Sequence, residues 1–185
     1  MTRPVCVDPV KLTMGDGRKP GVLIGPMHTE NQRRQILRIV DDAVEKGAHV
    51  LRGGRAPDEF TSGFFMTPTV LVDVPDNADV LAEEVFGPVL PVVKVKSFEE
   101  ALDRANESEF GLGASVWSNT REHVEKAVRD LQAGYTWVND MPTDYDALPF
   151  GGVKQSGFGK ERGHESIDEF RNLKSVVTPA SPEVF

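Results

Sequence analysis

The sequence has a single cysteine and no long apolar run. One thiol among 185 residues excludes an internal disulfide framework. The four histidines are scattered and no second cysteine accompanies them, so we expect no zinc site or other metal site. No apolar stretch approaches the roughly 18 residues of a membrane helix, and the first residues, Met1 to Cys6, lack the apolar core of a signal peptide. These absences predict a cytoplasmic protein that does not enter a membrane.

The sequence also has fewer basic than acidic residues. Lys and Arg number 21 against 29 Asp and Glu, which gives a net charge of -8. The average field of such a chain repels nucleic acid, and its acidity favours solubility. With 39% hydrophobic residues, the chain is long enough to bury the core of one domain with an appended arm.

Helix and strand signals alternate through the middle of the chain. Thr29 is placed as a helix N-cap with Gln32 at the capping-box position, and Ser97 repeats this pattern with Glu100. Expected helices lie near 29–46, 97–105, 119–131 and 164–170, and expected strands near 49–51, 69–72, 90–95, 113–117, 135–139 and 174–177. This order predicts an α/β fold with a mostly parallel sheet and flanking helices.

The predicted organisation has three parts. Residues 1–27 form an irregular N-terminal segment with several turn signals. Residues 28–170 form the α/β unit, and residues 171–185 form a C-terminal arm that contains the last strand.

A short turn between two apolar runs, Glu83 to Pro88, carries a carboxylate and an aromatic ring. The carboxylate of Glu84 can accept hydrogen bonds from the paired hydroxyls of a ribose. The ring of Phe86 can form a flat apolar wall beside a ligand ring, and Gly87 permits close approach. The alternative is a solvated acidic helix end followed by a core phenylalanine. Spacing alone leaves both interpretations open.

A glycine-rich segment follows Phe150 and extends to Gly163. It lacks the Gly-Lys-Ser/Thr of a phosphate-binding P-loop, and its glycines do not have the spacing of a dinucleotide fingerprint. We therefore interpret the segment as a long turn whose glycines permit positive φ.

The only thiol, Cys6, lies among prolines with no partner nearby in the sequence. A nucleophilic cysteine needs a lowered pKa and a positioned base. We therefore predict no catalytic residue in this chain.

Six markers occur in order along nearly the whole chain, from about Val10 to Val177. They are Ile24-Gly25-Pro26; Gly63-Phe64-Phe65 with Pro68-Thr69-Val70; Glu83 to Pro88; Ala105-Asn106 with Phe110-Gly111-Leu112; Val138-Asn139; and Pro149-Phe150-Gly151-Gly152 with Lys154 and Ser156-Gly157. Together they resemble the catalytic-domain portion, towards the C-terminus, of the NAD(P)-dependent aldehyde dehydrogenase superfamily.

The resemblance implies roles for matching positions. Glu84 corresponds to the glutamate that holds the nicotinamide ribose, and Phe86 to the aromatic residue beside the nicotinamide. Phe150 corresponds to an aromatic residue that lines the substrate tunnel, and Asn139 is expected beside that tunnel. The strand around Val176 resembles an arm that joins a neighbouring subunit's sheet, which implies a homo-oligomer.

The resemblance also implies what is missing. In this superfamily a Rossmann-type cofactor domain comes first, and the nucleophile lies in a Gly-Gln-x-Cys context. Cys6 lies 19 residues before Gly25 and lacks that context. The expected fold is thus a catalytic domain truncated at its N-terminus. It would bind no NAD or NADP tightly by itself, although the complete enzyme uses one of them.

Two functions remain open at this stage. The first is part of an enzyme that oxidises a small aldehyde to a carboxylic acid, inactive alone and completed by a separate polypeptide that carries the Rossmann half. The second is a non-catalytic module, derived from the same family, that acts in oligomerisation or interaction.

Overall fold

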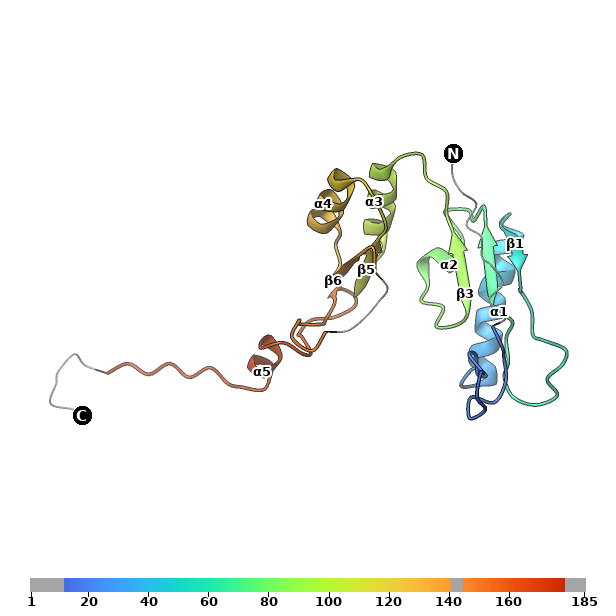
Figure 1. The fold of residues 1–185 in the computed structure, drawn as a ribbon, viewed down its shortest axis with the longest axis horizontal. Helices are drawn as coiled ribbons and strands as arrows, with labels where there is room; N and C mark the ends of the chain where they lie inside the picture. The colour runs from blue at the N-terminus through green and yellow to red at the C-terminus, as the bar shows by residue number, and fades with distance from the viewer. Residues whose placement is uncertain (1–11, 141–144, 179–185) are drawn as a thin grey trace. The chain divides into compact units, whose positions relative to one another are not determined.

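The computed structural model describes residues 12–140 and 145–178. The chain divides into two compact units, Met1–Lys94 and Val95–Phe185. Each unit combines helices with short strands (Figure 1). The α/β class expected from the sequence is confirmed. The predicted boundaries at residues 27 and 170 stay predictions.

The first unit packs one long helix against a three-stranded sheet. Helix α1, Glu30–Glu45, leads to strands β1, His49–Arg52, and β2, Thr69–Val72; the short helix α2, Asp79–Ala82, and strand β3, Val89–Val92, follow. The strand order is β1-β2-β3, with β1 antiparallel and β3 parallel to β2. Buried side chains of α1 and β2 form the core, among them Ile36, Ile39, Val40 and Leu71.

The start of α1 is set by the predicted cap. Thr29 has an extended backbone, and its hydroxyl oxygen accepts a hydrogen bond from the Gln32 amide at 3.1 Å. The Gln32 side chain returns to accept from the His28 amide at 3.2 Å. The first bond satisfies an amide that the helix itself leaves unpaired, so the predicted N-cap is confirmed. The return bond from Gln32 goes to His28, one residue before the N-cap, rather than to Thr29 as in a regular capping box.

The described residues of the second unit form two small sheets and three helices. Its elements are α3, Phe98–Glu107; β4, Phe110–Gly111; β5, Gly113–Val116; α4, Arg121–Asp130; β6, Tyr135–Val138; β7, Val153–Lys154; and α5, Glu165–Glu169. Strands β5 and β6 are parallel, whereas β4 and β7 are antiparallel. Residues 172–178, which follow α5, belong to no helix or strand in the structure.

The described residues therefore form three small sheets rather than one mostly parallel sheet, which corrects the expectation. The connections explain the directions of the strands. Strands β2 and β3 are joined through α2, and β5 and β6 through α4, and both pairs are parallel. No described helix lies between β1 and β2, and a connection without a crossover helix returns antiparallel.

Candidate functional site

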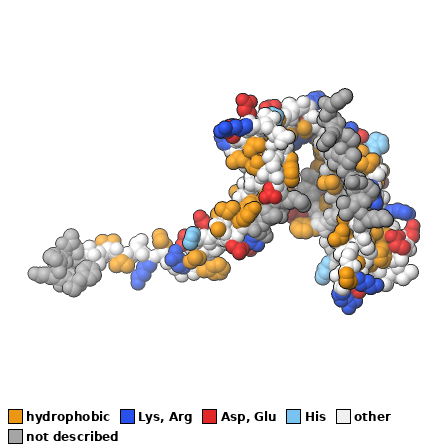
Figure 2. Space-filling view, viewed as in Figure 1, with side chains coloured by type: hydrophobic (Ala, Val, Ile, Leu, Met, Phe, Trp, Pro, Cys, Tyr) orange, Lys and Arg blue, Asp and Glu red, His pale blue; other side chains and the backbone are white. Residues whose placement is uncertain are grey.

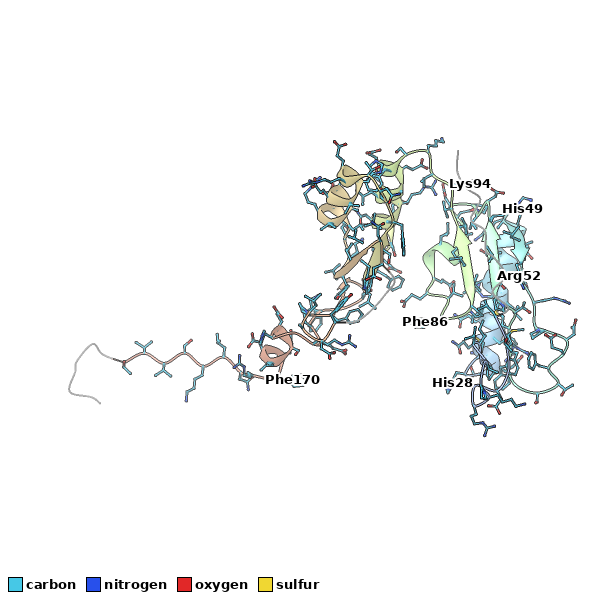
Figure 3. All side chains as sticks on the ribbon, in the orientation of Figure 1. His28, His49, Arg52, Phe86, Lys94 and Phe170 are labelled. Carbon is cyan, nitrogen blue, oxygen red and sulfur yellow. The ribbon has the colours of Figure 1, made fainter. Side chains whose placement is uncertain are left out.

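The predicted cofactor residues lie on the loop that joins α2 to β3 (Figure 3). Glu84 is exposed, and Phe86 is 74% exposed. Phe86 has a φ of 45°, in the left-handed region that residues with a Cβ avoid. The alternative of a core phenylalanine at this position is wrong, because the ring lies mostly in solvent. Strained backbone of this kind often occurs at ligand sites.

The backbone of the loop is held from both sides. On one side, the Gln32 side-chain amide donates to the carbonyl oxygen of Phe86 at 3.0 Å. A Cβ at Gly87 would lie 2.5 Å from the end of the Ile36 side chain, so any larger residue would force the buried Ile36 side chain of α1 to move. On the other side, the Thr69 amide donates to the Pro88 carbonyl at 2.7 Å. The exposed side chains thus extend from a backbone that is fixed at its anchors.

Charged residues join the helix before the loop to α1. Arg38 contacts both Asp79 and Glu83 at 3.1 Å. Lys46 contacts Asp79 at 3.0 Å and Asp42 at 2.8 Å. Hydrogen bonds from Lys46 and Arg38 lower the pKa of Asp79, and those from Lys46 and the Asp79 amide lower the pKa of Asp42. The N-cap position of α2 is Ala78, and Asp79, the first residue of this helix, forms these ion pairs.

The predicted tunnel residue Phe150 lies in the second unit. Its backbone forms a two-way bridge with Glu161, at 2.7 and 2.8 Å. Its ring packs on Tyr135, with centroids 5.7 Å apart and planes tilted by 52°. The Arg162 guanidinium lies 6.0 Å from the centre of the same ring. The ring is therefore part of an aromatic and cationic cluster at the start of β6.

Asn139 follows the other end of β6. It has a φ of 51°, and its side chain makes two bonds with the backbone of Ser118. The Ser118 amide donates to Oδ1 at 2.8 Å, and Nδ2 donates to the Ser118 carbonyl at 3.0 Å. Asn139 thereby joins the ends of β5 and β6, a structural role that the sequence did not reveal. With about 3.3 Å per residue, the four residues of β6 place Asn139 roughly 13 Å along the strand from Tyr135, on whose ring Phe150 packs.

The glycine-rich segment packs by its backbone. A Cβ at Gly134 would lie 1.8 Å from the carbonyl oxygen of Gly151, so two stretches of main chain lie in direct contact. Gly157, Gly159 and Gly163 all have positive φ. The positive φ values support the interpretation as a turn. The segment is not turn throughout, because it also contains strand β7.

Other expectations concern metals, membranes and Cys6. Over residues 12–140 and 145–178, no group of three or more His, Cys, Asp or Glu side chains is placed to hold a metal ion. Within the same ranges, no helix is both long enough and apolar enough to cross a membrane. Cys6 lies outside the described residues, as does part of the loop that follows Asn139.

The structure brings Glu84 and Phe86 together on one loop, while Phe150 and Asn139 belong to the other unit. All four role assignments stay predictions. Sequence reasoning missed the contact between Gln32 and Phe86, because its two residues are 54 positions apart. The capping box already accounted for Gln32 locally, so nothing in the sequence indicated a second role.

Comparison with known proteins identifies the class. The sequence model described as aldehyde dehydrogenase family matches residues 6–176. Aminoaldehyde dehydrogenase 2 of Pisum sativum, named as peroxisomal, is 40% identical over 172 residues, which cover 93% of this chain and 34% of that protein. Succinate-semialdehyde dehydrogenase 1 (NADP(+)) of Mycobacterium ulcerans is 38% identical over 165 residues, 89% of this chain and 36% of that protein.

Solved structures of aldehyde dehydrogenases also match this chain. An aldehyde dehydrogenase from Bacillus cereus superposes with a TM-score of 0.84 at 36% identity, over 89% of this chain and 33% of its own. Betaine aldehyde dehydrogenase from Staphylococcus aureus, solved in complex with NAD+, superposes with a TM-score of 0.81 at 33% identity. The match covers 86% of this chain and 32% of that protein. The chain belongs to the aldehyde dehydrogenase family. It spans about a third of the length of the curated relatives it matches, for example 34%. Because named relatives include peroxisomal and chloroplastic proteins, the cytoplasmic location stays a prediction.

Proposed function

We propose that this chain forms the part of an aldehyde dehydrogenase that grips the nicotinamide ribose and lines the aldehyde tunnel. The enzyme would oxidise an aldehyde to a carboxylic acid with NAD or NADP. The observation that carries this proposal is the loop of Glu84 and Phe86, where two exposed side chains extend from a backbone anchored to α1 and β2. Family membership and the relatives' names support the reaction class.

The residues of the loop fit the nicotinamide end of such a cofactor. The side chain of Glu84 offers two acceptor oxygens for the ribose hydroxyls, and the Phe86 ring offers a flat apolar surface for the nicotinamide. A fixed backbone lowers the entropy that these side chains lose when the ligand binds. The bound cofactor supplies the acceptor for the hydride that leaves the substrate. The chain's own contribution is to bind and orient.

On the substrate side, Phe150 is proposed to line the tunnel wall. Its ring is held by Tyr135 and Arg162, so it can present a rigid face to an aldehyde. Asn139 is proposed to lie beside the tunnel and to fix the loop after β6. Its amide is engaged with Ser118, so its contribution is placement of the backbone.

Saturation-transfer NMR tests the cofactor site directly. With NAD at millimolar concentration, we expect transfer between the Phe86 ring and the nicotinamide and ribose protons. Glu84→Gln and Phe86→Ala should each weaken it, while Glu45→Gln, an exposed charge change on α1, should leave it unchanged. Equal transfer in the Glu84 and Glu45 variants, or none in the wild-type chain, would contradict the proposed site.

The second candidate is an oligomerisation module, and the C-terminal segment favours it. Phe170, Leu173 and Val177 are 91%, 100% and 94% exposed. Figure 2 shows hydrophobic side chains spaced along the segment that follows α5. Such a row of apolar side chains is suited to pairing with a second copy of the chain. Oligomerisation is compatible with the enzyme proposal. Failure of NAD binding together with stable oligomers would favour the module alone.

A further inference from the structure

One side chain connects the cap of α1 to the strained residue of the candidate site. The Gln32 backbone amide donates to Thr29, and its side-chain oxygen accepts from the His28 amide. Its side-chain nitrogen is left to donate, and it does so to the carbonyl of Phe86 at 3.0 Å. All three bonds use different atoms of one residue. The orientation of the Gln32 amide is thus fixed by the helix start and extends to the loop.

The residue at the far end of this bond needs support. A residue with a Cβ is strained in a left-handed backbone. The net contribution of one hydrogen bond to stability is of the same order as that strain. Gly87, the next residue, packs on Ile36, which lies one helical turn after Gln32 on the same face of α1. One face of α1 therefore anchors two consecutive residues of the loop.

We propose that Gln32 is a positioning residue that fixes the left-handed backbone of Phe86 and so directs its exposed ring into solvent. The inference rests on the proposed function for the meaning of that direction, because the ring is expected to meet the nicotinamide. The geometric statement about Phe86 can be tested without any ligand.

The test uses a variant that separates the two roles of Gln32. Gln32→Glu keeps the oxygen that accepts from His28, and glutamate is equally suited to the capping box. It loses the donor to Phe86. Gln35→Glu, an exposed residue on the same helix, is the matched control for the added charge. The readout is the amide-to-Hα nuclear Overhauser effect of Phe86 in the isotope-labelled 185-residue chain, which is strongest at positive φ.

We expect the strong Phe86 signal to be lost in Gln32→Glu and kept in Gln35→Glu, with both chains still folded by circular dichroism. A signal of wild-type strength in Gln32→Glu would overturn the inference. If Gln32→Glu proves too unstable for NMR, a double-mutant cycle with Phe86→Gly decides. Glycine adopts positive φ without support, so the loss of stability caused by Gln32→Glu should be smaller in that background. An equal loss in both backgrounds would also overturn the inference.

Saturation transfer from NAD separates this inference from the proposed function. Transfer to Phe86 in the wild-type chain that is lost in Gln32→Glu supports both. If the wild-type chain shows no transfer while Gln32→Glu still loses the positive-φ signal, the proposed function fails and the positioning role holds. If transfer and the positive-φ signal both persist in Gln32→Glu, the proposed function holds and the positioning role fails.

Discussion

The left-handed backbone of Phe86 makes a prediction about stability that reverses the usual order of two substitutions. Phe86→Ala and Phe86→Gly both remove a ring that is already 74% exposed, so both lose the same small burial. Only alanine keeps a Cβ at a φ of 45°. The difference between the two variants therefore isolates the cost of the backbone conformation.

The expected difference follows from two opposing terms. Holding a Cβ in the left-handed region costs about 1–2 kcal/mol. Against this, alanine restricts the unfolded chain more than glycine does, which favours alanine by about 0.4–1 kcal/mol. We therefore expect the Phe86→Gly chain to be more stable than the Phe86→Ala chain by roughly 0.8 kcal/mol, the difference between the midpoints of these two terms.

Leu23 supplies the control within the same unit. It is 63% exposed, lies outside helices and strands, and does not have positive φ. At this position the usual order should hold, with the Leu23→Ala chain more stable than the Leu23→Gly chain by about 0.4–1 kcal/mol. Urea unfolding followed by far-ultraviolet circular dichroism measures both pairs. The reasoning is refuted if Phe86→Ala is at least as stable as Phe86→Gly while the Leu23 pair shows its expected order.

Local signals in the sequence predicted the elements well. The start of α1 follows from Thr29 and Gln32, and the start of α3 from Ser97, whose hydroxyl accepts from the Glu100 amide at 3.1 Å. Caps and apolar periodicity act within a few residues, so a single sequence contains them. Pro91 lies in β3, an edge strand of its three-stranded sheet in the described structure, where a residue without an amide hydrogen is tolerated.

Pairings and exposure depend on distant residues, and there the sequence was less informative. It did not reveal that the strands would form separate sheets, because partners are chosen in the tertiary fold. Val128 and Ala127 are both apolar residues of α4, yet Val128 is 55% exposed whereas Ala127 is buried. The apolar stripe of this helix is wider than the surface it packs on.

The candidate site shows the same division between local and distant signals. The sequence identified Glu84 and Phe86 by residue type and order, which were enough to suggest a ribose and a nicotinamide contact. It gave no sign that Phe86 would adopt a left-handed backbone, since that conformation depends on Gln32 and on the close approach of Gly87 to α1. Asn139 was assigned to the tunnel, and its two bonds to Ser118 emerged only in the fold.

The remaining predictions concern activity, assembly and pH. The 185-residue chain mixed with an aldehyde and NAD should form no NADH; sustained formation abolished by Cys6→Ala would refute the rejection of that thiol. When a second polypeptide that supplies the Rossmann half and the nucleophile is added, NADH should form. Light scattering should show a dimer or larger species that deletion of residues 171–185 reduces to a monomer; a monomer at high concentration in the undeleted chain would contradict this. Finally, hydrogen bonds from Lys46 lower the pKa of both Asp42 and Asp79 in the folded chain. Their stabilising effect is therefore complete above the unfolded-state pKa of about 3.9 and is lost as the pH falls through the lower folded-state values. The melting temperature should fall as the pH is lowered through that acidic range. The fall should be less steep in Asp79→Asn, and also in high salt, which screens these partly exposed pairs. An unchanged acid dependence in Asp79→Asn would show that the ion pairs between α1 and α2 do not stabilise the support of the Phe86 loop.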